Sequence, residues 1–125
     1  MDEKELTDSV IGCCIEIHRT LGPGLLESVY EEVLSFELKE KGISFTRQQI
    51  VPVEYRGRVL EAGFRADIIV NDKIILEIKS VEKILPLHSK QLLTYLKLTQ
   101  KRIGLLINFN VNLLKDGIKR IVNGY

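Results

Sequence analysis

The sequence predicts an α+β or mixed α/β protein in which helices flank a central mixed β-sheet. Two observations support this fold class. Apolar residues recur at helical spacing near the start of the chain and again over residues 87–99, whereas the segments between and after them alternate with period two or form short apolar runs. The expected order of elements is α-α-β-β-β-β-α-β-(α)-β. With 125 residues, the chain has room for one compact domain, residues 1–125.

The composition excludes several classes of protein. With 45% hydrophobic and 28% charged residues, the chain can build a core and stay soluble, which excludes a disordered chain. Its 18 basic and 17 acidic residues leave a net charge of +1, so any contact with nucleic acid would use a local patch. No apolar run approaches the about 18 residues of a membrane span. The adjacent Cys13 and Cys14 are expected as reduced thiols, which favours a cytoplasmic location.

The first two elements are expected to be amphipathic helices. Residues 6–21 carry apolar side chains at helical spacing, with Thr7 or Asp8 available as the cap. The Gly-Pro-Gly sequence at residues 22–24 interrupts this pattern, and a second helix ends at Gly42. The apolar stripe expected along the second helix consists of Leu26, Val29, Val33 and Phe36, widened by Tyr30, Leu34 and Leu38.

The next segment is expected to form strands. Residues 45–55 alternate with period two, residues 56–57 form a turn, and residues 59–60 form a short return strand. Pro52 favours an edge position or a bulge, because proline cannot donate a hydrogen bond to a neighbouring strand.

A second hairpin follows, in which residues 65–71 and 74–79 flank the short polar connection at residues 71–73. The remaining expected elements are a helix over residues 87–99, a buried strand over residues 103–108, and a last strand over residues 117–122 after a helical turn near Leu113.

Three charged residues of this second hairpin, Asp67, Glu77 and Lys79, are the least expected in the chain, because they lie in otherwise apolar strands. Side chains alternate along a strand, so Glu77 and Lys79 share one face. A three-residue loop would place Asp67 opposite Glu77 on that face. Two converging carboxylates form an oxygen site suited to Mg²⁺ or Mn²⁺, and a nearby ammonium can orient water or stabilise charge on a phosphoryl oxygen. From spacing alone, Glu77 and Lys79 are equally compatible with solvent-facing charges of an edge strand.

Two motifs carry a resemblance to known families. Residues 65–67 followed by residues 77–79 resemble the D…(D/E)-x-K core of the PD-(D/E)xK nuclease superfamily. Gly24, Glu27 and Tyr30 resemble the G-x-x-E-x-x-Y signature of the GxxExxY protein family, and this similarity runs from about Leu6 nearly to the C-terminus.

The resemblance implies a restriction-endonuclease-like sandwich with a metal site. Asp67, Glu77 and the backbone carbonyl of Ile78 would bind Mg²⁺ (or Mn²⁺), and Lys79 would serve the hydrolytic water. Ala66 stands where the superfamily pattern has proline. That departure leaves the acid pair and the lysine intact.

The second helix offers a further acid to this site. Glu27, Tyr30 and Glu31 lie at positions i, i+3 and i+4 and so share one helix face. Alone, Glu27 also suits a helix N-terminus, where its charge complements the helix dipole. With the family resemblance, we expect Glu27 to act as a metal-side or water-positioning acid, with Tyr30 and Glu31 lining the site.

The helix expected at residues 87–99 carries a polar stripe. His88, Gln91 and Tyr95 lie three and then four residues apart, beside an apolar face. Gln91 and Tyr95 resemble the Q-x-x-x-Y element of exonuclease-type branches of the superfamily, which implies that Gln91 belongs to the catalytic set and Tyr95 lines the site. His88 is a candidate for phosphate contact or proton transfer, although a histidine at a helix start also suits a structural or solvated role.

The leading hypothesis is a metal-dependent nuclease that hydrolyses phosphodiester bonds of DNA or RNA, with no membrane partner. The alternative is a catalytically silent, nuclease-like domain that binds nucleic acid or a protein. At 125 residues almost the whole chain is needed for the core fold, so a homodimer or a recruiting protein partner would be required to choose a target.

Overall fold

The structure is a computed structural model that describes residues 1–124, apart from the side chain of Ala62. Its elements in chain order are α1 (Glu3–Leu21), α2 (Glu27–Glu40), β1 (Phe45–Tyr55), β2 (Arg58–Val70), β3 (Ile74–Lys79), α3 (Pro86–Thr99), β4 (Ile103–Asn108), the 3-10 helix η1 (Leu114–Gly117) and β5 (Ile118–Val122). The second and third helices, the last two strands and the short helical turn lie close to where the sequence predicts them.

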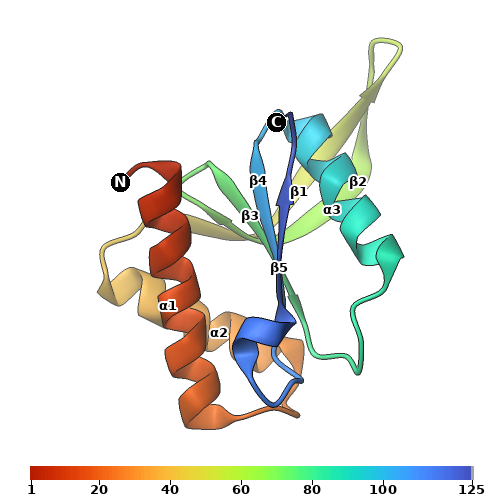
Figure 1. Ribbon diagram of the computed structural model, residues 1–125. Helices are drawn as coiled ribbons and strands as arrows, with labels where there is room; N and C mark the ends of the chain where they lie inside the picture. The colour runs from red at the N-terminus through yellow and green to blue at the C-terminus, as the bar shows by residue number, and fades with distance from the viewer. Residues whose placement is uncertain (125) are drawn as a thin grey trace.

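The five strands form one mixed sheet in the order β1-β2-β3-β4-β5. Strands β3 and β4 are parallel, and the pairs β1–β2, β2–β3 and β4–β5 are antiparallel. Helices α1 and α2 cover one face of the sheet and α3 covers the other (Figure 1). The predicted sandwich of helices on a mixed sheet is therefore confirmed.

The larger apolar core lies between the sheet and the pair α1 and α2. In α2 the fully buried apolar side chains are Tyr30, Leu34 and Leu38, and Val33 is partly buried against the same core. Phe36 and the N-cap residue Leu26 are 59% and 71% exposed. The predicted main stripe of this helix was therefore wrong except at Val33, and the residues expected to widen it form the centre of the buried face. The rotation of α2 is set by Tyr30, which stacks on Phe109 with ring centroids 4.2 Å apart.

The first helix begins earlier than the sequence predicts. Its cap is Asp2 rather than Thr7 or Asp8, since the Asp2 carboxylate accepts the backbone N–H of Glu5 at 2.8 Å. Glu5 completes a capping box with Asp2, in which each side chain accepts the backbone N–H of the other residue. The spacing of apolar residues does not indicate such a polar cap, which is why the predicted helix starts too late.

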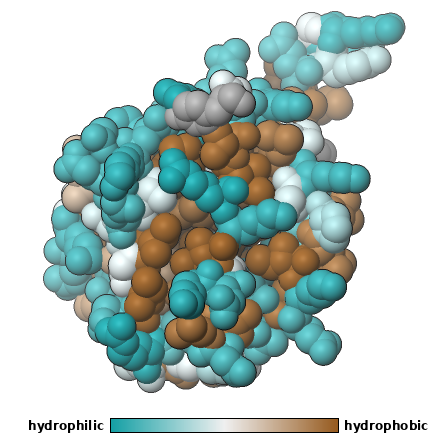
Figure 2. Space-filling model, in the orientation of Figure 1, coloured by the Kyte–Doolittle hydropathy of each residue, from teal (hydrophilic) through white to brown (hydrophobic). Residues whose placement is uncertain are grey.

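The β1–β2 hairpin is longer than expected. The predicted short strand at residues 59–60 and the strand at residues 65–71 are parts of one strand, β2. The register between β1 and β2 shifts between Val51 and Val53, so Pro52 lies at an irregularity of an edge strand, as predicted. A Cβ on Gly63 would lie 2.2 Å from the Val51 carbonyl oxygen, so this irregularity requires glycine. The far end of the hairpin projects from the body of the molecule and ends in hydrophilic side chains (Figure 2).

The β2–β3 hairpin has the predicted register. Its pairs are Ile68 with Leu76, Ile69 with Ile75, and Val70 with Ile74. Continuing this register by one residue puts position 67 opposite position 77. The tight turn uses the left-handed conformation at Asn71 and Asp72, with φ of 50° and 54°, which is a conformation these residue types tolerate well.

Two further expectations concern the cysteines and membranes. Cys13 and Cys14 are both free and buried, as predicted. Burial raises the pKa of both thiols, so both stay protonated at neutral pH. None of the helices within residues 1–124 is long and apolar enough to cross a membrane.

Candidate active site

A polar pocket lies between the sheet and α3, on the face opposite α1 and α2. Its volume is about 260 Å³. The residues that line it are Arg65, Asp67, Glu77, Lys79, His88, Gln91, Leu92, Tyr95 and Leu106. The structure thus brings together the charged residues of β2 and β3 and the polar stripe of α3.

Asp67 lies where β2 and β3 stop pairing. The last paired residues are Ile68 and Leu76, so the next backbone N–H groups of β3 need another acceptor. Asp67 supplies it, since its Oδ2 accepts the backbone N–H of Ile78 at 2.8 Å. The break in the ladder therefore places a carboxylate directly beside Glu77 on β3.

Glu77 is a buried acid whose carboxylate is not fully hydrogen-bonded. It is 8% exposed, and its Oε1 has no hydrogen-bond partner. The pKa of Glu77 is raised to about 8, first because burial removes solvent from the carboxylate and then because of the negative charge of Asp67, while the ammonium of Lys79 offsets part of the effect. In the absence of a cation, the pair therefore retains a proton at neutral pH.

This acid pair fits a divalent cation. Two oxygen ligands of like charge and an unpartnered buried oxygen are the features that a hard cation compensates. Within residues 1–124 no group of three or more His, Cys, Asp and Glu side chains is arranged to hold a metal ion. Ligands beyond the two carboxylates would therefore have to come from the backbone, water or a substrate.

Helix α3 presents polar groups to the other side of the pocket. The Nδ1 atom of His88 accepts the Leu85 N–H at 3.1 Å, so the neutral ring carries its proton on Nε2. Tyr95 stacks on Phe64 of β2, with ring centroids 3.7 Å apart. Burial and the nearby Glu77 raise the pKa of the Tyr95 hydroxyl, which keeps it a hydrogen-bond donor. Gln91 lies between His88 and Tyr95 on this wall of the pocket.

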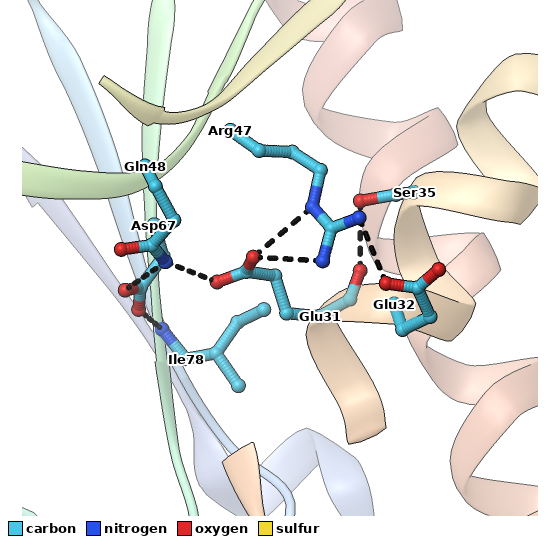
Figure 3. Close-up of polar contacts among 7 residues, drawn as sticks. All are labelled: Glu31, Glu32, Ser35, Arg47, Gln48, Asp67 and Ile78. Atoms are coloured by element: carbon cyan, nitrogen blue, oxygen red, sulfur yellow. Dashed lines mark hydrogen bonds and ion pairs between the residues drawn. The ribbon is translucent and has the colours of Figure 1, made fainter. Parts of the chain in front are cut away.

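Helix α2 is connected to the acid pair by Glu31, through the side chain of Gln48. Its two carboxylate oxygens are occupied by Arg47 and Gln48 of β1, and the amide of Gln48 also lies 3.4 Å from Oδ1 of Asp67 (Figure 3). Glu31 therefore lies one side chain away from Asp67.

The G-x-x-E-x-x-Y segment stabilises the connection between α1 and α2. The hydroxyl of Tyr30 donates to the Gly22 carbonyl at 2.6 Å and accepts the Leu25 N–H at 3.2 Å. Tyr30 is fully buried in the core and does not line the pocket. Glu27 is exposed at the first position of α2 and also lies outside the pocket lining. The structure thus does not bring Glu27 and Tyr30 together with Asp67 and Glu77 in the pocket.

Two residues of the site were not singled out from the sequence. Arg65 lines the pocket from β2. Its position two residues before Asp67 was a usable signal, because such residues share a strand face. Gln48 contacts Asp67 from β1, and no pattern in the sequence indicates this contact. Its φ of 52° in the middle of a strand is visible only in the structure.

The acid pair and lysine at the point where two strands separate, within a mixed sheet covered by helices, define a nuclease-type domain. The chain belongs to the PD-(D/E)XK nuclease superfamily, whose family model matches residues 4–121. Nucleases of this superfamily typically use divalent metal ions. No curated protein matches the chain.

Proposed function

We propose that this protein is a nuclease that uses a divalent metal ion to hydrolyse phosphodiester bonds in nucleic acid. The observation that carries the proposal is the pairing of the half-buried Asp67 with the buried Glu77, whose Oε1 has no hydrogen-bond partner, in a pocket that Lys79 also lines. An uncompensated pair of acids costs stability, and a divalent cation removes that cost.

The residues suited to hold Mg²⁺ or Mn²⁺ are Asp67, Glu77 and the backbone carbonyl of Ile78. When bound, the ion would polarise a phosphoryl oxygen and lower the pKa of a water molecule. The other polar residues of the pocket are cations and hydrogen-bond donors, which suits an anionic phosphodiester, and Leu92 and Leu106 complete the lining.

In this proposal the polar residues of the pocket share the chemical tasks. Lys79, on the same face of β3 as Glu77, positions the attacking water or stabilises charge on a phosphoryl oxygen. Arg65 forms an ion pair with a phosphate. On α3, the Nε2–H of His88 and the amide of Gln91 donate to phosphate oxygens, and Tyr95 lines the wall. Glu27 has no task in this proposal because it is exposed outside the pocket lining.

The first test is a calorimetric titration of Mn²⁺ and Mg²⁺ into the wild type and Asp67→Asn, beside cleavage assays on single- and double-stranded DNA and RNA. We expect Asp67→Asn to lose both Mn²⁺ binding and cleavage. The matched control is Asp116→Asn, an exposed aspartate on η1, which should leave both unchanged.

A second variant separates metal binding from hydrolysis. Lys79→Met should retain Mn²⁺ binding, because Lys79 is no ligand, and should lower cleavage about 10²- to 10⁴-fold. Metal binding without cleavage by the wild type would instead favour the catalytically silent, nuclease-like domain. No Mn²⁺ binding at all would contradict the proposal.

Proton release gives an independent check on the site. Because the pKa of Glu77 is raised to about 8, Mn²⁺ must displace its proton at pH 7. Titrations in buffers of different ionisation enthalpy should therefore report release of about one proton at pH 6.5 and almost none well above pH 8. Release that does not change with pH would contradict Glu77 as a ligand.

A further inference from the structure

We propose that Gln48 is a positioning residue, whose side-chain amide is anchored on Glu31 and holds the carboxylate of Asp67 in the orientation that binds the metal ion. The inference rests on the proposed function, because it assigns Asp67 to a metal site. It adds the residues that orient this ligand, and it changes the expected role of Glu31 from lining the site to anchoring Gln48.

Glu31 is an anchor because both its oxygens are already engaged. It is 7% exposed. Oε2 accepts from Nε of Arg47 at 3.1 Å and lies 3.0 Å from the Nη2 atom of the same guanidinium. Oε1 accepts the amide of Gln48 at 2.6 Å. Arg47 also reaches Glu32 at 2.8 Å, so α2 and β1 are joined by a charged network (Figure 3).

Gln48 has an unusual backbone conformation at the position that faces Asp67. The pairs Arg47 with Ile68 and Gln49 with Ala66 flank it, so Gln48 lies opposite Asp67. Its φ of 52° places it in the left-handed region, where a non-glycine residue is strained. Such strain persists where the surroundings require it, and here the side chain reaches two carboxylates.

The contacts explain how Gln48 acts on Asp67. A glutamine amide has two N–H donors, and the same nitrogen lies 2.6 Å from Glu31 and 3.4 Å from Oδ1 of Asp67. Oδ2 of Asp67 is held by the N–H of Ile78. Contacts at both oxygens restrict rotation of the carboxylate. Because the amide is neutral, it can orient this ligand without the repulsion that a lysine would exert on a metal ion.

The direct test replaces Gln48 by glycine. Gln48→Gly removes the amide but adopts positive φ without strain. We expect Mn²⁺ affinity to fall about 10-fold, as for loss of other groups that orient metal ligands, while the free energy of unfolding stays equal or rises. A merely structural role for the side chain would lower stability and leave Mn²⁺ affinity unchanged.

Two companion variants define the effect. Gln48→Asn keeps an amide and tolerates the left-handed conformation, so it should recover part of the lost Mn²⁺ affinity. Gln49→Ala removes the same chemical group one residue away, where Gln49 bonds to Thr46, and should bind Mn²⁺ like the wild type. An affinity within twofold of the wild type for Gln48→Gly would overturn the inference.

A double-mutant cycle tests whether Glu31 acts through Gln48. Glu31→Gln should weaken Mn²⁺ binding in the wild-type background and have no further effect in Gln48→Gly. Equal, additive effects in both backgrounds would make Glu31 an independent participant and overturn the anchoring role. If the wild type binds Mn²⁺ and Gln48→Gly binds equally well, only this inference fails. If the wild type binds none, the proposed function fails with it.

Discussion

The two faces of the sheet differ in whether their buried polar groups have hydrogen-bond partners. On the face covered by α1 and α2, the hydroxyls of Tyr30 and Ser35 and the ring of His18 all bond to backbone carbonyls. On the α3 side, the Oε1 of Glu77 and the hydroxyl of Ser89 are the buried side-chain atoms without a partner among residues 1–124.

The groups that stabilise the fold and the groups of the candidate site therefore lie on different faces of the sheet. A satisfied polar group inside a large apolar core adds to folding, whereas an unpartnered acid beside a second acid subtracts from it. The α1 and α2 face therefore stabilises the fold. The α3 face contains the groups to which the proposed function assigns a cation and a phosphate.

The largest expected effect is on the stabilising face. Leu34→Ala should lower the free energy of unfolding by about 2–5 kcal/mol, because it leaves a cavity between α2 and the sheet. Its control on the same helix is Phe36→Ala, which should change stability by less than about 0.5 kcal/mol, since Phe36 is exposed. Urea denaturation measures both. Similar losses for the two variants would mean that α2 buries the other stripe.

The acid pair should lower the stability of the metal-free protein, whereas Leu34 raises it. Between the ordinary pKa of glutamate, 4.5, and the raised pKa of Glu77, about 8, the folded protein keeps a proton that the unfolded chain has released. The free energy of unfolding therefore falls as pH rises through this window, by about 1.4 kcal/mol per pH unit.

Glu77→Gln removes this penalty. In EDTA at pH 8 the variant should be more stable than the wild type by about 2–4 kcal/mol, and its stability should lose the fall between pH 4.5 and 8. Denaturation at several pH values tests this, with the exposed Glu61→Gln of β2 as control. Parallel pH curves for the wild type and Glu77→Gln would contradict the burial of an uncompensated acid.

The smallest effect concerns a single hydroxyl of the stabilising face. Tyr30→Phe keeps the stack on Phe109 but loses the bonds to Gly22 and Leu25, and should cost about 1–2 kcal/mol. Mn²⁺ affinity should not change, since Tyr30 lies outside the pocket. Tyr55→Phe, at an exposed tyrosine of β1, serves as the control for denaturation. A weaker Mn²⁺ affinity in Tyr30→Phe would show that the two faces are coupled.

Much of the fold follows from local patterns. Apolar spacing located the helices, period-two alternation located β1, and the polar connection at residues 71–73 located β3. The three-residue connection at residues 71–73 was enough to predict the register of the β2–β3 hairpin. These features depend on neighbours in the sequence and on the period of the backbone, so they can be inferred before any packing is known.

The errors arose where packing decides between local alternatives. Residues 59–60 and 65–70 belong to one strand because β2 pairs with β1 on both sides of the irregularity at Gly63. The face of α2 that is buried is decided by contacts of Tyr30 with Phe109, which lies far away in the sequence.

The candidate site shows the same division. By itself, the sequence determined that Glu77 and Lys79 share a strand face, that Asp67 is in register with them, and that His88, Gln91 and Tyr95 share a helix face, because strand and helix periods are local properties. Only the tertiary structure decided that α3 lies over the acids and that Glu31 rather than Glu27 is linked to Asp67 through Gln48. The same holds for the contact of Gln48 with Asp67, because these relations depend on how helices dock on the sheet and on one strained residue of β1.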